Sequence, residues 1–98
     1  MGVRHVVLFR FAEGVTPAEV EAIERGLAAL PAAIPEIREY RFGIDLGLVE
    51  RNADYAIVGD FATLEDYISY RDHPEHRAFI ERCIEGVVTE RLAVQYEA

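Results

Sequence analysis

Residues 3–11, VRHVVLFRF, constrain the fold more than any other part of this chain. The segment is rich in β-branched and aromatic side chains, which predicts a β-strand. Alternate side chains of a strand point to opposite faces, and here both faces are apolar in the middle. A strand of this kind is covered on both sides. With 98 residues we expect one domain over 1–98 with one core, so the chain's own helices can cover only one side.

Two segments carry the signals of a helix start. Thr16-Pro17-Ala18-Glu19 combines a capping threonine, proline at the first helical position and the glutamate of a capping box. Apolar residues then recur at helical spacing: Val20, Ile23, Leu27, Leu30 and Ile34. A second helix starts after Thr63, Pro74 interrupts it and begins a new helix, and Gly86 ends that helix.

Three further strands are predicted, over residues 38–46, 54–61 and 87–96. The resulting order β-α-β-β-α-β is that of an α+β, ferredoxin-like protomer, with helices on one face of a four-stranded sheet. We place His5, Val7 and Phe9 on the opposite face, which nothing in the chain is left to cover. An apolar face of that size indicates an interface or a ligand site. Two such sheets packed face to face would complete a dimeric α/β-barrel, so we expect a homodimer.

Charge limits the other partners. The formal net charge is −8, and the ten basic residues, all arginine, are scattered singly along the sequence. Without a basic cluster, binding to nucleic acid or to an anionic membrane is not expected. The N-terminus runs directly into a strand pattern without the features of a signal peptide, and no apolar run reaches the length of a membrane span. We therefore expect a cytoplasmic protein whose partners are a second copy and a small hydrophobic ligand.

Several segments together resemble the stress-responsive dimeric α/β-barrel (Dabb) family, and the similarity spans nearly the whole chain. They are RHVVLF at 4–9, FGIDLGL at 42–48, DYAIVGDF at 54–61, DYISYRDHPEH at 66–76 and RLAVQY at 91–96. The most specific combination is the His-Pro-x-His element, the tyrosines before it and the histidine of the first strand. The resemblance implies a ferredoxin-like protomer and a homodimer with a central barrel.

For function, the resemblance implies less. Most members have no assigned activity, some plant members are linked to stress resistance, and a few cyclise polyketide chains without a cofactor. In those cyclases a histidine of the His-Pro-x-His element is the base and a nearby tyrosine its partner, which correspond here to His76 and Tyr70. His5 corresponds to the strand histidine that lines the pocket. Where a further histidine is expected, this chain has Tyr55.

The residues themselves agree with this chemistry. His76 falls on the apolar stripe of its helix, so its ring points inward, and a partly buried imidazole suits a general base. Tyr70 can stabilise a developing oxyanion. The alternative is structural: His76 braces the helix start, and the tyrosines are amphipathic packing residues. The expected substrate-binding residues are His5, Val7, Phe9, Tyr55, Tyr67, His73 and Phe79.

No metal and no cofactor are expected. Pro74 disrupts the geometry that would let His73 and His76 share a metal ion, and no well-placed carboxylate or thiolate completes a set with His5. Glycine-rich phosphate loops, dinucleotide fingerprints and nucleophile elbows are absent from the sequence. Cys83 is the one cysteine, and it lies in an apolar helix segment.

Three functions remain compatible with the sequence. The first is a cofactor-free cyclase or isomerase acting on carbonyl or polyketide-like substrates in an apolar pocket, with His76 as general base. The second is a non-catalytic stress-response or ligand-binding module. The third is a cofactor-free oxygenase. An open cavity beside His76 and Tyr70 favours an enzyme, whereas a side-chain-filled barrel favours the module.

Overall fold

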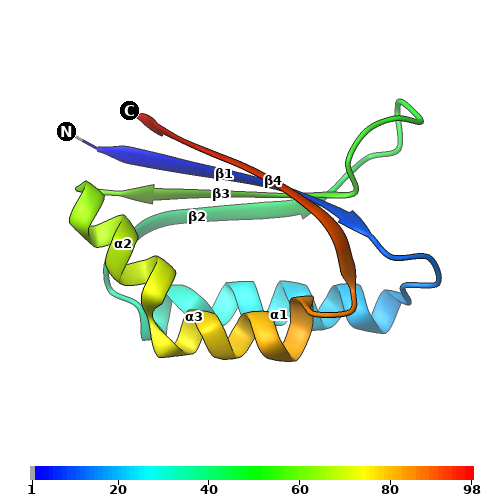
Figure 1. The fold of residues 1–98 in the computed structure, drawn as a ribbon, viewed down its shortest axis with the longest axis horizontal. Coiled ribbons are helices and arrows are strands. Elements are labelled where there is room, and N and C mark those ends of the chain that lie inside the picture. Colours follow the sequence, from blue (N-terminus) through cyan, green and yellow to red (C-terminus); the bar gives the residue numbers. More distant parts are fainter. Residues whose placement is uncertain (1) are drawn as a thin grey trace.

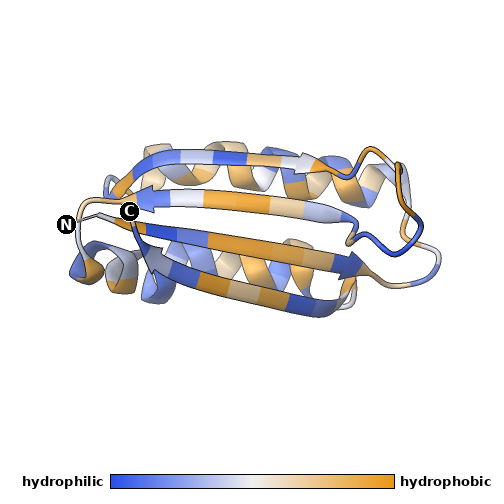
Figure 2. Ribbon diagram, turned by 90° about the horizontal axis from the view of Figure 1, so that it is seen from above, coloured by the Kyte–Doolittle hydropathy of each residue, from blue (hydrophilic) through white to orange (hydrophobic). Residues whose placement is uncertain are grey.

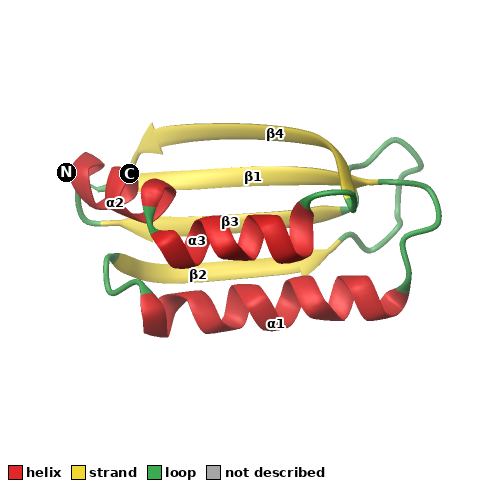
Figure 3. Cartoon of the chain, turned by 60° about the horizontal axis from the view of Figure 1, so that its bottom comes forward, coloured by secondary structure: helices red, strands yellow, loops and turns green. Residues whose placement is uncertain are grey.

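The computed structural model of the protein describes residues 2–98 and confirms the α+β, ferredoxin-like order (Figure 1). The elements are β1 Val3–Phe11, α1 Pro17–Ala33, β2 Ile37–Ile44, β3 Tyr55–Phe61, α2 Leu64–Asp72, α3 Pro74–Phe79, the π-helical turn η1 Ile80–Ile84 and β4 Val88–Glu97. The four strands form one antiparallel sheet in the order β2-β3-β1-β4. The helices lie on one side of this sheet, and β4 runs along its edge (Figure 3).

The predicted start and stop signals are confirmed. The Thr16 hydroxyl accepts a hydrogen bond from the Glu19 amide, and the Glu19 carboxylate accepts one from the Thr16 amide, which together form a capping box. Thr63 caps α2 by accepting from the Asp66 amide. Gly86 follows η1 with a φ of +81°, a left-handed conformation that glycine adopts without strain.

The face of β1 that the helices cover is the opposite of the one expected from the sequence. Val7 and Phe9 are 4% and 5% exposed in the core beneath the helices, and His5 is buried there with them. The prediction that these three side chains lie on the uncovered face is therefore wrong. Both faces of this strand are apolar, so the alternation groups its residues correctly but does not decide which group the helices cover.

The uncovered face instead carries the other alternate residues of β1, together with their neighbours on β3 and β4. Val6, Leu8, Val58, Leu92 and Val94 lie on it, with Leu92 and Val94 68% and 55% exposed. At one end the Arg4 guanidinium pairs with the Asp60 carboxylate at 2.7 Å and lies over the Tyr96 ring. Figure 2 views the sheet from this side, with the helices behind it and apolar residues in the middle of β1, β3 and β4. A face of this composition is typical of an interface.

The connection between β2 and β3 is an open loop, as expected. β2 ends at Ile44, two residues before the predicted boundary, because Asp45 bonds within the loop. Its carboxylate accepts hydrogen bonds from the Gly47 amide and the Asn52 side chain. Leu46 and Leu48 follow, 84% and 80% exposed. Within residues 2–98, no helix combines the length and the apolar character needed to cross a bilayer.

Candidate functional site

A narrow cavity of about 50 Å³ lies between the helix-facing side of the sheet and α2, α3 and η1. The sheet contributes side chains from all four strands, and the helical segments close the other side. The lining residues are His5, Val7, Phe9, Tyr40, Ile57, Tyr70, His76, Phe79, Ile80, Ile84 and Arg91. Most of this wall is apolar. The groups that can exchange protons or donate hydrogen bonds are two histidines, two tyrosines and one arginine.

His76 is held in one orientation by the backbone. Pro74 begins α3 two residues earlier, and the His76 Nδ1 lies 3.0 Å from the Arg71 carbonyl oxygen. Because a carbonyl only accepts hydrogen bonds, Nδ1 carries the proton in the neutral ring and Nε2 keeps its lone pair. Burial is the largest cause that lowers the pKa of His76, and the charge of Arg91 adds to it. The ring is therefore neutral at pH 7, with Nε2 as a proton acceptor.

Tyr70 packs against this imidazole. Its ring lies 4.3 Å from the His76 ring, centroid to centroid, and its hydroxyl lies 2.5 Å from the Tyr40 hydroxyl. Burial raises the pKa of Tyr70 to about 12, so the phenol stays protonated at neutral pH. Either hydroxyl can donate the Tyr40–Tyr70 hydrogen bond, and one arrangement has Tyr40 donating to Tyr70. In that arrangement the Tyr70 proton is free to bind another acceptor.

His5 lies across the cavity on β1 and has the opposite hydrogen-bonding pattern. Its Nδ1 lies 2.8 Å from the side-chain amide nitrogen of Gln95 on β4, which donates to it. Nε2 of the neutral ring therefore carries the proton. Burial, with the charges of Arg91 and His76, lowers the pKa of His5 to about 4. The site thus combines two neutral imidazoles: Nε2 of His76 can accept a hydrogen bond, and Nε2 of His5 can donate one.

A π-helical turn forms part of the wall. Residues Ile80–Ile84 continue α3 with a wider turn, and Ile80 and Ile84 line the cavity. π-Helical turns are rare and frequently occur at functional sites. The sequence predicted an ordinary helix here, because the apolar spacing of this segment fits an α-helix equally well.

The structure brings together most of the predicted site residues. His5, Val7, Phe9 and Phe79 line the cavity with His76 and Tyr70. Tyr67 contacts the His5 ring at 5.0 Å between centroids but does not line the cavity. His73 lies outside it, where its Nδ1 accepts from the Glu75 amide and caps α3. The sequence did not predict Tyr40 and Arg91 as site residues. Both line the cavity because the pairing of β2 with β3 and of β4 with β1 places them there.

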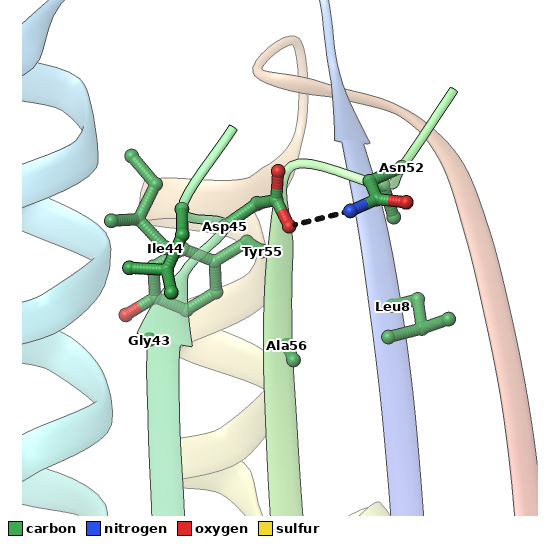
Figure 4. A pocket seen from close by; sticks show the side chains of 9 residues that line it. Leu8, Gly43, Ile44, Asp45, Asn52, Tyr55 and Ala56 are labelled. Atoms are coloured by element: carbon green, nitrogen blue, oxygen red, sulfur yellow. Dashed lines mark hydrogen bonds between the residues drawn. The ribbon is translucent and has the colours of Figure 1, made fainter. Parts of the chain in front are cut away.

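Tyr55, predicted to bind substrate, is not part of this cavity. It lines a separate hollow of about 380 Å³ beside the end of β2, the start of β3 and the loop between them, together with Leu8, Gly43, Ile44 and Asp45 (Figure 4). The Asp45–Asn52 hydrogen bond closes one side of this hollow. The hollow has an acidic group but no histidine or cysteine, so the groups suited to proton transfer at neutral pH lie in the other cavity.

The buried Tyr55 hydroxyl has no hydrogen-bond partner among residues 2–98. An unsatisfied buried hydroxyl costs about 1–3 kcal/mol. We therefore expect Tyr55→Phe to raise the free energy of unfolding by roughly 1 kcal/mol. Tyr40→Phe, which removes a paired hydroxyl, should lower it by a similar amount. Urea unfolding of both variants tests this, and a destabilised Tyr55→Phe protein would mean that the hydroxyl has a partner in the assembled protein.

In the described part of the chain, no three residues among His, Cys, Asp and Glu lie close enough to hold a metal ion. Cys83 is buried between α1 and η1, where its thiol lies 3.7 Å from the Ala22 carbonyl oxygen. It is not among the residues that line the cavity.

Comparisons with known proteins agree with the fold. The family model described as the stress responsive A/B barrel domain matches residues 3–98. The stress-response A/B barrel domain-containing protein HS1 of Arabidopsis thaliana is 29% identical over 97 residues, covering 97% of this chain and 88% of that protein.

Solved structures extend the similarity. A dimeric ferredoxin-like protein of unknown function from Thermobifida fusca is 45% identical, covers 100% of this chain and 92% of that chain, and has a TM-score of 0.92. A hydroxynitrile lyase from Passiflora edulis has a TM-score of 0.85 at 20% identity, covering 97% of this chain and 91% of that chain. At that identity the likeness is one of fold.

Proposed function

The chain belongs to the stress-responsive A/B barrel domain family, and we propose that it is a homodimeric, cofactor-free acid–base catalyst acting on a small, largely apolar carbonyl compound. The observation that carries this proposal is the contact between His76 Nδ1 and the Arg71 carbonyl oxygen, from which the tautomer of His76 follows. Its Nδ1–H donates to the Arg71 carbonyl, which leaves Nε2 as a neutral base in an apolar cavity beside the Tyr70 phenol. A general base contributes about 10²- to 10⁴-fold to a reaction rate.

The proposed step is removal of a proton from the carbon next to the carbonyl. Nε2 of His76 takes the proton, the C–H electrons form the enolate double bond, and the carbonyl oxygen gains the negative charge. The Tyr70 hydroxyl donates a hydrogen bond to that oxygen, and the Tyr40–Tyr70 hydrogen bond, which either hydroxyl can donate, is then donated by Tyr40. In cyclisation the enolate carbon then forms a bond to a second carbonyl carbon, whose C=O π electrons move to its oxygen, and that oxygen takes the proton back from His76. In isomerisation the proton returns from His76 to another carbon.

Dimerisation would complete the barrel over the uncovered face. The face carries exposed leucine and valine side chains on β1 and β4, including Leu92 at 68% exposed. The Thermobifida fusca relative is described as dimeric. Packing two such faces would remove this apolar surface from water, a change worth about 25 cal/mol per Å².

A ligand-binding module without catalysis is the second candidate, and the size of the cavity favours it. A volume of about 50 Å³ is well below the roughly 300–1,000 Å³ of typical ligand sites. For a larger molecule to bind, Ile80 and Ile84, both half-buried, must change rotamer, or the ligand must extend past Arg91 at the sheet edge.

Deuterium exchange separates these candidates without knowledge of the natural substrate. Small alkyl and aryl ketones and β-keto acids are incubated with the protein in D₂O at pH 7, and deuterium uptake at the α-carbon is followed by NMR. We expect uptake above that caused by the same concentration of imidazole for at least one compound. Binding of these compounds without accelerated exchange would instead support the non-catalytic module.

A further inference from the structure

The cavity has an unbalanced charge. Among residues 2–98, Arg91 is the only one in the cavity wall with a permanent charge, and no carboxylate of these residues lines the cavity. Arg91 lies opposite Phe9 in the β1–β4 pairing, so its side chain is on the helix-facing side of the sheet, at the edge strand β4. Among the described residues it forms no salt bridge, although five of the other arginines do: Arg4, Arg10, Arg41, Arg71 and Arg77.

Arg91 also acts electrostatically on the reacting groups. Its charge contributes to the lowered pKa of His5 and of His76, and it lowers the pKa of Tyr70 against the effect of burial. The Arg91 guanidinium shifts the pKa of three cavity side chains, and no carboxylate in the cavity wall neutralises its charge. The same charge attracts an anionic group on a ligand. Arginine suits this role because its planar fork of donors matches the two oxygens of a carboxylate.

We propose that the ligand of this cavity is a small carboxylic acid with an apolar body, and that Arg91 binds its carboxylate at the edge of the sheet. This rests on the proposed function and narrows its substrate class to keto acids. The apolar body lies against Val7, Phe9 and Phe79, and the carboxylate stays near the exposed end of the cavity, where less desolvation is required. The reacting carbonyl then lies deeper, beside Tyr70 and His76.

The test compares benzoate with benzamide, which have nearly the same shape and differ in charge. Binding to the 98-residue protein is measured at constant ionic strength by NMR titration of backbone amides. We expect the wild type to bind benzoate at least about 10-fold more tightly than benzamide, because hydrogen bonds to charged groups are the stronger ones. Arg91→Gln should remove that preference and leave benzamide binding unchanged.

Arg82→Gln is the matched control, since it removes one exposed arginine that lines no part of this cavity. It should keep the preference for benzoate. Equal loss in both variants would indicate general charge attraction and overturn the proposal, as would undetectable benzoate binding by the wild type. A dimer weakened by Arg91→Gln, with no benzoate preference in the wild type, would assign Arg91 to a partner carboxylate and overturn it too.

The outcome is independent of catalysis. Benzoate has no proton on the carbon next to its carboxylate, so its binding preference reports on Arg91 and not on the base His76. If deuterium exchange depends on His76 while benzoate shows no preference, the substrate class is wrong and the acid–base function stands. If benzoate binds through Arg91 and no exchange is found, the ligand class is right and the acid–base function is wrong.

Discussion

Val7→Asp is expected to prevent folding, whereas Val6→Asp, one residue away, is expected to leave the fold intact and abolish the dimer. Val7 is 4% exposed beneath the helices, so an aspartate there would be an unpaired charge in the core. The penalty is several kcal/mol, a large part of the roughly 5–15 kcal/mol that stabilises a typical domain. Val6 points to the uncovered face and is half-buried, so in a monomer its replacement stays in contact with water.

Circular dichroism and sedimentation distinguish the two outcomes. The wild type should sediment at about twice the chain mass of 11.1 kDa at micromolar concentration, and Val6→Asp at about 11.1 kDa with a native spectrum. Val7→Asp should lack the native spectrum altogether. If Val6→Asp keeps the oligomeric state and the melting temperature of the wild type, the uncovered face is not the dimer interface.

The second large effect is expected for His76→Gln in the deuterium-exchange assay. Glutamine keeps a polar side chain of similar length but cannot take up a proton, so exchange should fall by about 10²- to 10⁴-fold. Tyr70→Phe should cost less, because it removes one hydrogen bond to the enolate oxygen and leaves the base in place. Both effects should appear in kcat, since the interactions strengthen in the transition state.

His73→Asn supplies the control for this measurement. His73 lies outside the cavity and caps α3 through its side chain, a role that asparagine also fills. This variant should exchange substrate protons at the rate of the wild type. A His76→Gln protein that loses thermal stability but keeps full exchange would assign His76 a structural role.

The order of the elements was predictable because each boundary has its own local signal. Thr16, Thr63 and Gly86 mark helix ends by chemistry that does not depend on the rest of the fold. The covered face of β1 was not predictable in this way. Both faces of the strand are apolar in the middle, so its pattern alone did not decide which face the helices cover. The imidazole of His5 is satisfied in the core by Gln95, from a strand 90 positions later.

The residues of the candidate site also fall into a group that was predicted from the sequence and a group that was not. The pairing of His76 with Tyr70 was expected because the resemblance to the family implies it, and the structure places their rings 4.3 Å apart. Tyr40 and Arg91 reach the cavity only through the sheet register, which pairs Arg91 with Phe9 and Tyr40 with Gly59. A one-residue shift in register would turn either side chain to the other face.

The protonation of His76 in the unliganded protein tests the central claim most directly. Long-range ¹H–¹⁵N NMR spectra identify which ring nitrogen carries the proton and follow the ring through a pH titration. At pH 7 we expect a neutral His76 with the proton on Nδ1 and a bare Nε2, and a pKa below the usual 6.5 because the ring is buried. The His76→Gln spectrum assigns the signal. A ring that is charged at pH 7, or one that carries its proton on Nε2, would contradict the account of His76 as the general base.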